Sequence, residues 1–184
     1  MTYSISGYEY LPTLLDSREV TYLEASLNNE FETRISEWDE GRGMVKMIYK
    51  PPCAEEYYNR VQYFLTSFLR TDLLQTYWFC TQYYNESFML PHTDRDACEV
   101  SVSLNISQDK PWELQLLDRF GKTCKFDTLP GDGVLYNGID LEHWREPYQG
   151  QQYTQLFFHY VRSTGPYYRE QGDEANGDQG VRLY

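Results

Sequence analysis

A chain of 184 residues is long enough for one ordinary domain, which buries roughly 70% of the surface that its unfolded form exposes. The 28 acidic and 16 basic residues give a formal net charge of -12, which repels nucleic acid and anionic lipid and favours basic or neutral partners. The sequence has no apolar run of about 18 residues and no basic N-terminal region followed by an apolar one. We therefore expect a soluble cytoplasmic protein that binds neither nucleic acid nor membrane.

The first part of the chain carries two helical patterns and one strand pattern. Asp16 and Glu19 form a capping pair, and apolar residues follow at helical spacing, which predicts a helix over about 17–29. Residues 43–50 mix β-branched and aromatic side chains before a Pro-Pro pair, which predicts a strand. Apolar residues at steps of three and four predict a second packing helix over 54–70. Its expected buried stripe consists of Tyr57, Val61, Phe64, Leu65, Phe68 and Leu69.

After the second helix the apolar period changes from 3.6 to 2, which is typical of strands. The predicted strands are 76–84, 99–106, 112–117, 122–126, 134–136 and 153–162. Residues 99–106 alternate so regularly that we expect a half-buried antiparallel strand. The fold class that follows is α+β and mostly β: a double-stranded β-helix, or jelly roll, with the two N-terminal helices packed on one sheet.

The expected organisation is one domain over residues 1–184. Residues 1–75 would form the helical support, 76–163 the jelly-roll core and 164–184 a loosely ordered, Gly-rich and acidic tail. The four cysteines show no C-x-x-C spacing, so we expect small, buried, reduced thiols. They are Cys53, Cys80, Cys98 and Cys124.

His92 and Asp94 stand two residues apart at the end of a predicted strand, so their side chains should point the same way. With His143 they form the two-histidine, one-carboxylate set that holds Fe(II) and leaves positions open for chemistry. Some catalytic zinc sites use the same ligands, so zinc is the competing metal. The alternative without metal is a solvated surface pair. The third histidine, His159, lies in an apolar strand and is expected to be a hydrogen-bonded core residue.

This arrangement resembles the Fe(II)/2-oxoglutarate-dependent dioxygenases, and within them the prolyl 4-hydroxylase-like branch. The resemblance covers about residues 76–162 and rests on the order of segments in the sequence: Pro-His-Thr-Asp at 91–94, the alternating strand, Leu-Pro-Gly-Asp-Gly-Val-Leu-Tyr-Asn-Gly at 129–138, His143 and Gly150. It implies Fe(II), 2-oxoglutarate as co-substrate and O2, and it allows ascorbate. It implies no catalytic side chain beyond the metal centre. Tyr83, nine residues before His92, would help to hold the co-substrate, with Tyr84 as the fallback.

One departure from the family pattern concerns the positive charge that binds the distal carboxylate of 2-oxoglutarate. The family has lysine or arginine nine or ten residues past the second histidine, where this chain has Gln152 and Tyr153. We expect Arg145 to supply the charge, because in an extended segment it would share the face of His143 about 6.5 to 7 Å further along.

Two alternatives to this role of Arg145 stay open. Arg145 could instead pair with a neighbouring acid such as Glu142 or Glu146. The anchoring cation could also be Lys122 or Lys125 on a nearby strand.

The function that follows is hydroxylation of an unactivated C–H bond, most simply of a prolyl residue in a peptide or protein or of a free amino acid. Asp94 favours hydroxylation over halogenation, because the related halogenases lack this carboxylate. The alternative function is a non-catalytic jelly-roll protein that binds a metal or small ligand, which the missing lysine favours. The sequence does not indicate an oligomeric state.

Overall fold

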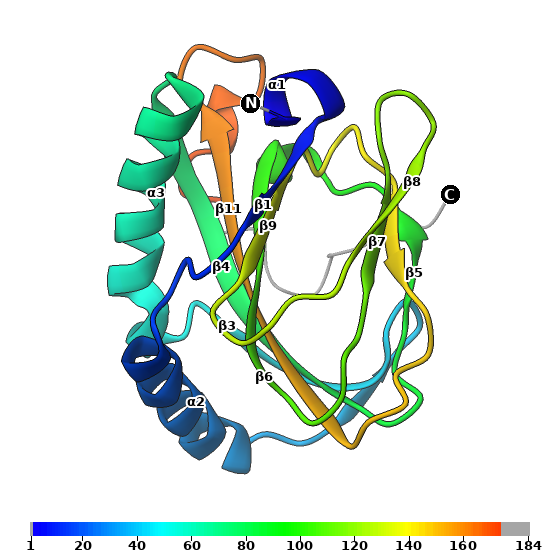
Figure 1. Cartoon of the computed structure of the whole chain (residues 1–184). Coiled ribbons are helices and arrows are strands. Elements are labelled where there is room, and N and C mark those ends of the chain that lie inside the picture. Colours follow the sequence, from blue (N-terminus) through cyan, green and yellow to red (C-terminus); the bar gives the residue numbers. More distant parts are fainter. Residues whose placement is uncertain (1, 174–184) are drawn as a thin grey trace.

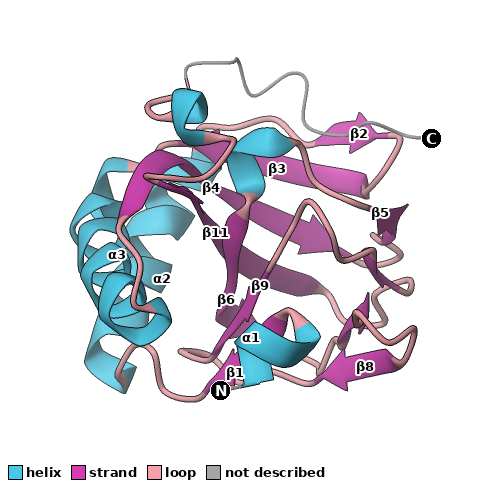
Figure 2. Cartoon of the chain, turned by 90° about the horizontal axis from the view of Figure 1, so that it is seen from above, coloured by secondary structure: helices cyan, strands magenta, loops and turns pink. Residues whose placement is uncertain are grey.

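The computed structural model describes residues 2–173 as two antiparallel sheets that face each other, with two helices outside the larger one (Figures 1 and 2). The larger sheet has the order β1-β9-β6-β11-β4-β3-β2 and the smaller one β5-β10-β7-β8. The strands are β1 Tyr8–Leu11, β2 Glu37–Asp39, β3 Gly43–Tyr49, β4 Leu73–Tyr84, β5 Met89–His92, β6 Val100–Gln108, β7 Leu114–Leu117, β8 Thr123–Phe126, β9 Gly133–Tyr136, β10 His143–Arg145 and β11 Gln152–Arg162. The predicted jelly roll is confirmed.

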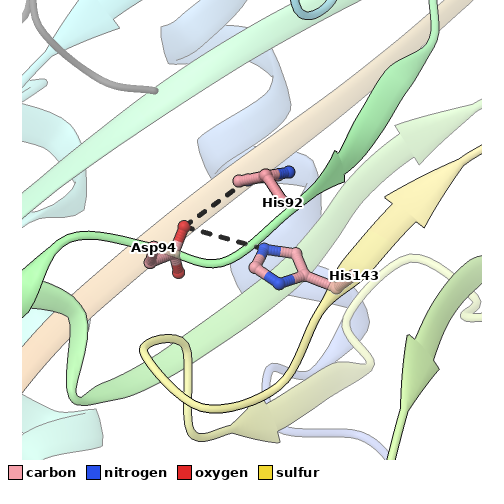
Figure 3. A group of neighbouring side chains, drawn as sticks. All are labelled: His92, Asp94 and His143. Carbon is pink, nitrogen blue, oxygen red and sulfur yellow. Dashed lines mark ion pairs between the residues drawn. The ribbon is translucent and has the colours of Figure 1, made fainter. Parts of the chain in front are cut away.

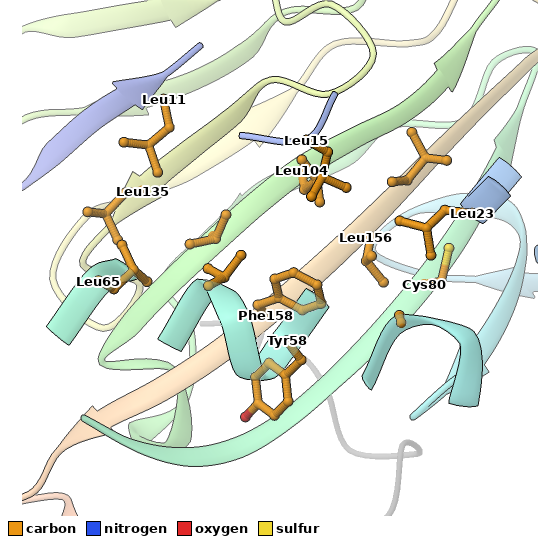
Figure 4. Close-up of a cluster of buried hydrophobic side chains, with 14 of the residues drawn as sticks. Leu11, Leu15, Leu23, Tyr58, Leu65, Cys80, Leu104, Leu135, Leu156 and Phe158 are labelled. Carbon is orange, nitrogen blue, oxygen red and sulfur yellow. The ribbon is translucent and has the colours of Figure 1, made fainter. Parts of the chain in front are cut away.

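The two longer helices cover the outer face of the larger sheet, as predicted. Helix α2 spans Ser17–Glu32 and begins with the predicted capping box, in which Asp16 accepts from the Glu19 amide and the Glu19 carboxylate accepts from the Asp16 amide. Helix α3 spans Glu55–Leu69. Apolar side chains from both helices form one core cluster with those of β6 and β11 (Figure 4). None of the described helices is long and apolar enough to cross a membrane.

The buried stripe of α3 differs from the prediction. Tyr58 is buried in place of Tyr57, and Phe64 is 42% exposed. Tyr58 is selected because its ring stacks on Tyr160 and its hydroxyl donates to the His159 carbonyl at 2.7 Å. Helical spacing allows several neighbouring stripes, and tertiary contacts choose among them.

Several short elements were not predicted. They are α1 Thr2–Ser6, β1, β2, β5, β10 and the 3-10 turns Pro52–Ala54, Asp96–Cys98 and Tyr168–Glu170. Strand β1 pairs with β9 and closes one edge of the larger sheet, while β2 and β3 close the other. The first 75 residues therefore supply strands as well as helices.

Strand β6 is buried on both faces, which corrects the expectation of a half-buried strand. Val102 and Leu104 face the helices, whereas Ser101, Ser103 and Asn105 face the space between the two sheets. The predicted alternation of polar and apolar residues along β6 is present, but its polar face lies toward the interior of the barrel and not toward solvent. These polar residues therefore line the interior.

Part of the predicted loose tail is packed against the sheet. The Gly172 amide donates to the Gln75 carbonyl at 2.8 Å, the Tyr49 hydroxyl donates to the Asp173 carbonyl at 3.2 Å, and Asp173 pairs with Arg95. The rest of the predicted tail, residues 174–184, lies outside the described residues. All four cysteines are free thiols, of which Cys80 and Cys98 are buried and the other two are partly exposed.

Candidate active site

Two histidines meet across the smaller sheet at the inner face of the barrel. His92 ends β5 and His143 begins β10, where they are register partners. Asp94 follows two residues after His92, and its Oδ1 lies 3.6 Å from Nε2 of His92 and 3.7 Å from Nε2 of His143 (Figure 3). The structure therefore brings together the three residues that the sequence analysis predicted as metal ligands.

Both histidines are held in the same tautomer. Nδ1 of His92 donates to the Leu90 carbonyl at 2.7 Å, and Nδ1 of His143 donates to the Leu141 carbonyl at 2.9 Å. Because a carbonyl can only accept, the proton must be on Nδ1 in each ring. Each Nε2 atom then carries a lone pair and faces Asp94, which is the orientation of a metal-binding imidazole.

The protonation states also suit a metal. Burial alone would raise the pKa of Asp94, but the nearby imidazoles of His143 and His92 outweigh it and lower that pKa to about 2. Burial lowers the pKa of His143 to about 4, against the smaller opposing effect of Asp94. At neutral pH the group consists of a carboxylate and a neutral imidazole ready to bind a cation.

The three ligand atoms fit one face of a six-coordinate ion. Adjacent ligands lie about 3 Å apart when each bond is about 2.1 Å long, so the separations of 3.6 and 3.7 Å between Asp94 and the two histidines need to close by about 0.6 to 0.7 Å. Asp94 is held by its backbone, whose amide donates to the Gly138 carbonyl at 2.8 Å. A Cβ at Gly138 would overlap Oδ2 of Asp94 and lie 2.6 Å from the Cys98 carbonyl, so a side chain there would displace Asp94.

Arg145 lies inside the barrel and is only 4% exposed. Its guanidinium donates to the Trp112 carbonyl and, at 3.1 Å, to Oε1 of Gln155. It also lies 4.7 Å from the ring centroid of Trp112 and 5.0 Å from that of Tyr153. Within residues 2–173 it makes no ion pair, so the alternative of a pairing with Glu142 or Glu146 does not occur. A buried cation with only neutral partners is costly and is complementary to an anion.

The lysines considered as alternative anchors lie elsewhere. Lys122 and Lys125 are both exposed, and Nζ of Lys125 pairs with Glu113 at 3.1 Å on the outer surface. Neither reaches the barrel interior. Tyr153, at the position where the family carries its basic residue, instead packs its ring against the guanidinium of Arg145. The positive charge of Arg145 is thus on β10, and the Tyr153 ring that packs against it is on β11.

Tyr83 is 1% exposed, and its hydroxyl has no hydrogen-bond partner in the described part of the chain. Burial raises its pKa, while the charges of Arg42 and Arg145 act in the opposite direction, so the phenol lies near both guanidinium groups. Tyr84 is on the opposite face of β4, where its hydroxyl donates to Gln82 at 2.6 Å. The fallback tyrosine is therefore outside the barrel.

Two residues near this site were not singled out from the sequence. Arg42 lies in the turn between β2 and β3, is buried and pairs with Asp39 at 3.0 Å. Burial lowers its pKa, but the nearby groups, among them Tyr83, Asp39 and Asp94, outweigh burial and raise it. Gln155 is a polar residue in the most apolar strand, and it faces the barrel interior beside Tyr153. A polar residue in such a strand was the available signal for Gln155.

His159 departs from the expectation of a fully hydrogen-bonded core residue. Nδ1 is hydrogen-bonded to Oγ of Ser101 at 2.8 Å, but the buried Nε2 has no partner among the described residues. One nitrogen of His159 also lies within 4.8 Å of ligand atoms of Asp94 and Cys98. This histidine therefore lies beside the candidate metal ligand Asp94.

Comparison with known proteins identifies the fold. No family model and no curated protein sequence matches the chain. A prolyl-4-hydroxylase from Pseudomonas putida is 17% identical, with a TM-score of 0.71 over 88% of this chain and 95% of that one. A Trichoplax adhaerens prolyl hydroxylase, solved with a hypoxia-inducible-factor peptide, is 15% identical, with a TM-score of 0.73 over 86% of each chain.

A third similar structure is the epimerase SnoN, solved with Fe3+, alpha-ketoglutarate and nogalamycin RO. It is 11% identical, with a TM-score of 0.75 over 99% of this chain and 93% of that one. At these identities the likeness establishes the fold, which is the jelly roll of the 2-oxoglutarate and Fe(II) oxygenases. The part of the resemblance that concerns the fold is confirmed.

Proposed function

We propose that this protein is a non-haem Fe(II)/2-oxoglutarate-dependent dioxygenase. The observation that carries the proposal is the presence, inside one barrel, of a two-histidine, one-carboxylate group and a buried arginine that has no anionic partner among residues 2–173. The three ligands fit a divalent cation, and the unbalanced charge of Arg145 fits a dicarboxylate.

His92, Asp94 and His143 would hold the iron. When bound there, Fe(II) together with O2 and 2-oxoglutarate would supply oxidation of a substrate C–H bond coupled to decarboxylation of the co-substrate. The protein's part is to fix the ligands. The Leu90 and Leu141 carbonyls orient the two imidazoles, and the negative charge of Asp94 is kept by the rings beside it.

Arg145 and Tyr83 would hold the distal carboxylate of 2-oxoglutarate. The guanidinium is fixed by Trp112 and Gln155, so its fork needs little reorganisation to accept a carboxylate. The Tyr83 hydroxyl has a proton to donate and no acceptor for it among the described residues, and a carboxylate oxygen would accept this hydrogen bond. The absence of the family's lysine, which favoured a non-catalytic binding protein, is thereby compensated by Arg145.

For the substrate we propose a prolyl residue of a peptide, or a free amino acid. Support comes from the names of two similar structures, which are prolyl hydroxylases, one of them solved with a peptide. The net charge of -12 favours a substrate that is basic or neutral. Asp94 supports hydroxylation, because it leaves no position for a halide at that ligand site.

The test is a screen of purified protein with Fe(II), 2-oxoglutarate and O2 against proline, lysine and proline-containing peptides. The expected result is succinate formation together with a mass gain of one oxygen in a proline-containing substrate. Succinate without any mass gain in the prolyl set would overturn the prolyl assignment but not the reaction class. If neither product forms with any substrate and Fe(II) fails to bind, the non-catalytic alternative holds.

A further inference from the structure

The two oxygens of Asp94 face different neighbours. Oδ1 faces the iron-site histidines, whereas Oδ2 lies 3.5 Å from Oγ of Ser101. Figure 3 shows the second oxygen pointing away from both imidazoles. Beyond Ser101 lie Cys98 and His159, and ligand atoms of these two residues and of Asp94 lie within 4.8 Å of one another. Asp94 therefore belongs to two groups of potential metal ligands.

The imidazole of His159 has a nitrogen available. The Ser101 hydroxyl also contacts the Cys98 carbonyl at 3.1 Å, and a carbonyl can only accept, so the single hydroxyl proton is donated there. Oγ of Ser101 then accepts from Nδ1–H of His159, and Nε2 is left with a lone pair. That atom is buried and has no hydrogen-bond partner in residues 2–173, and an unpaired buried polar atom carries a free-energy cost. A cation would remove this cost.

The third ligand is a thiol. Cys98 is 2% exposed, and its Sγ lies 3.1 Å from the Tyr77 hydroxyl. Burial raises the pKa of Cys98, so the free thiol is protonated and unreactive. A bound cation reverses this preference, because a coordinating thiol is deprotonated outright.

We propose that Asp94, Cys98 and His159 form a second metal position, which takes a borderline-soft dication, with Zn2+ the best fit. Carboxylate, thiolate and imidazole are ligands that zinc accepts together, and the thiolate selects against the harder Fe(II). On binding, the S–H bond of Cys98 breaks, a Zn–S bond forms, and the proton leaves to solvent. The two negative ligands then balance the charge of the cation within a buried site.

Because Asp94 is shared, zinc at this position would weaken iron binding. One carboxylate would face two dications only a few ångströms apart, and its charge would be divided between them. The second position is thus an inhibitory site for zinc beside the proposed iron site. The proposal depends on the proposed function only for this inhibitory consequence, not for the binding of zinc.

Co2+ is the probe for the test, because it replaces Zn2+ and a thiolate ligand gives it a near-ultraviolet charge-transfer band. Wild-type protein should show this band, and Zn2+ should displace it. Cys98→Ser should lose the band and weaken zinc binding by at least the roughly 10- to 100-fold that second-shell changes cost. Cys124→Ser, a partly exposed thiol elsewhere, is the matched control and should keep it.

Two further variants separate this proposal from the iron site. His143→Ala should lose Fe(II) binding yet keep the thiolate–cobalt band, while His159→Gln should weaken the band with Cys98 still present. Circular dichroism would establish that each variant is folded. Absence of the band in wild-type protein, or its persistence in Cys98→Ser, would overturn the second position whatever the result for iron.

Discussion

His92 and His143 lie directly opposite each other on β5 and β10, with ring centroids 4.3 Å apart. Each ring donates from Nδ1 to the carbonyl of the residue two positions earlier in the chain. The same local hydrogen bond thus fixes both Nε2 atoms toward Asp94.

Replacement of Asp94 should abolish tight Fe(II) binding. Asp94→Asn removes the only charged ligand of the proposed centre while keeping its shape, and His143→Ala removes a nitrogen ligand. Asp96→Asn is the matched control, because Asp96 is exposed and begins the short turn after the site. Titration with Fe(II) under anaerobic conditions measures the difference. Equal binding by Asp94→Asn and Asp96→Asn would show that the metal is held elsewhere.

Arg145→Gln should raise the KM for 2-oxoglutarate by about 100-fold, or about 2.8 kcal/mol, because it removes the proposed partner of a buried carboxylate. Iron binding should be retained, since Arg145 is not one of the three proposed ligands. Lys125→Gln removes a positive charge from the outer surface and should change neither quantity. A normal KM in Arg145→Gln would transfer the anchoring role to another cation, of which the buried Arg42 is the nearest candidate.

Tyr83→Phe should separate stability from co-substrate binding. The Tyr83 hydroxyl is buried and has no partner in the part of the chain that the structure describes, so its removal should leave the melting temperature of the free protein unchanged or slightly raised. The affinity for 2-oxoglutarate should fall by about 10- to 150-fold, because a hydrogen bond to a charged group contributes about 1.5 to 3 kcal/mol. A large loss of stability with unchanged affinity would mean that the hydroxyl serves the fold.

Gly138→Ala should lower iron affinity, because the added methyl group overlaps Oδ2 of Asp94. Gly121→Ala is the control for the general cost of such a change, since a Cβ there meets nothing within 4 Å, although its positive φ of 76° costs about 1 to 2 kcal/mol. Fe(II) titration and thermal melting should be read together. Normal iron affinity in folded Gly138→Ala would mean that Asp94 can move without losing the metal.

The metal-free protein should lose stability as the pH falls from about 6.5 toward 4. Burial lowers the folded-state pKa of His143 and of His159 to about 4, below the value of about 6.5 in the unfolded chain. In that interval the unfolded chain binds more protons than the folded one. For each such proton the free energy of unfolding falls by about 1.4 kcal/mol per pH unit as the pH decreases. Urea midpoints measured with a chelator present should follow this trend, and His159→Gln should make it shallower. A flat profile would contradict buried neutral imidazoles.

Much of the fold followed from periodicity, because long amphipathic helices and alternating strands carry a strong local signal. Helix α2 began at the predicted cap, and β11 was predicted within one residue. Short strands such as β1 and β2 were missed because only pairing with β9 and β3 defines them. The interior face of β6 was misassigned because a polar row facing a second sheet has the same pattern as one facing water.

Part of the candidate site could also be predicted from local sequence periodicity. The ligand spacing and the face of Arg145 could be derived from the two-residue strand repeat. Two features could not be derived: Nε2 of His159 has no partner among the described residues, and Arg42 is buried. Both depend on contacts between residues far apart in the chain. Tyr153 stands where the dioxygenases that the sequence resembles have a basic residue, and the contact of its ring with Arg145 is visible only in the structure.

The most direct test of the central claim is an anaerobic absorption spectrum of the protein with Fe(II) and 2-oxoglutarate. Chelation of 2-oxoglutarate by iron held at His92, Asp94 and His143 should give a weak visible charge-transfer band. The band should be absent without either component and absent in Asp94→Asn. Wild-type protein that binds Fe(II) but never gives the band with saturating 2-oxoglutarate would contradict the account.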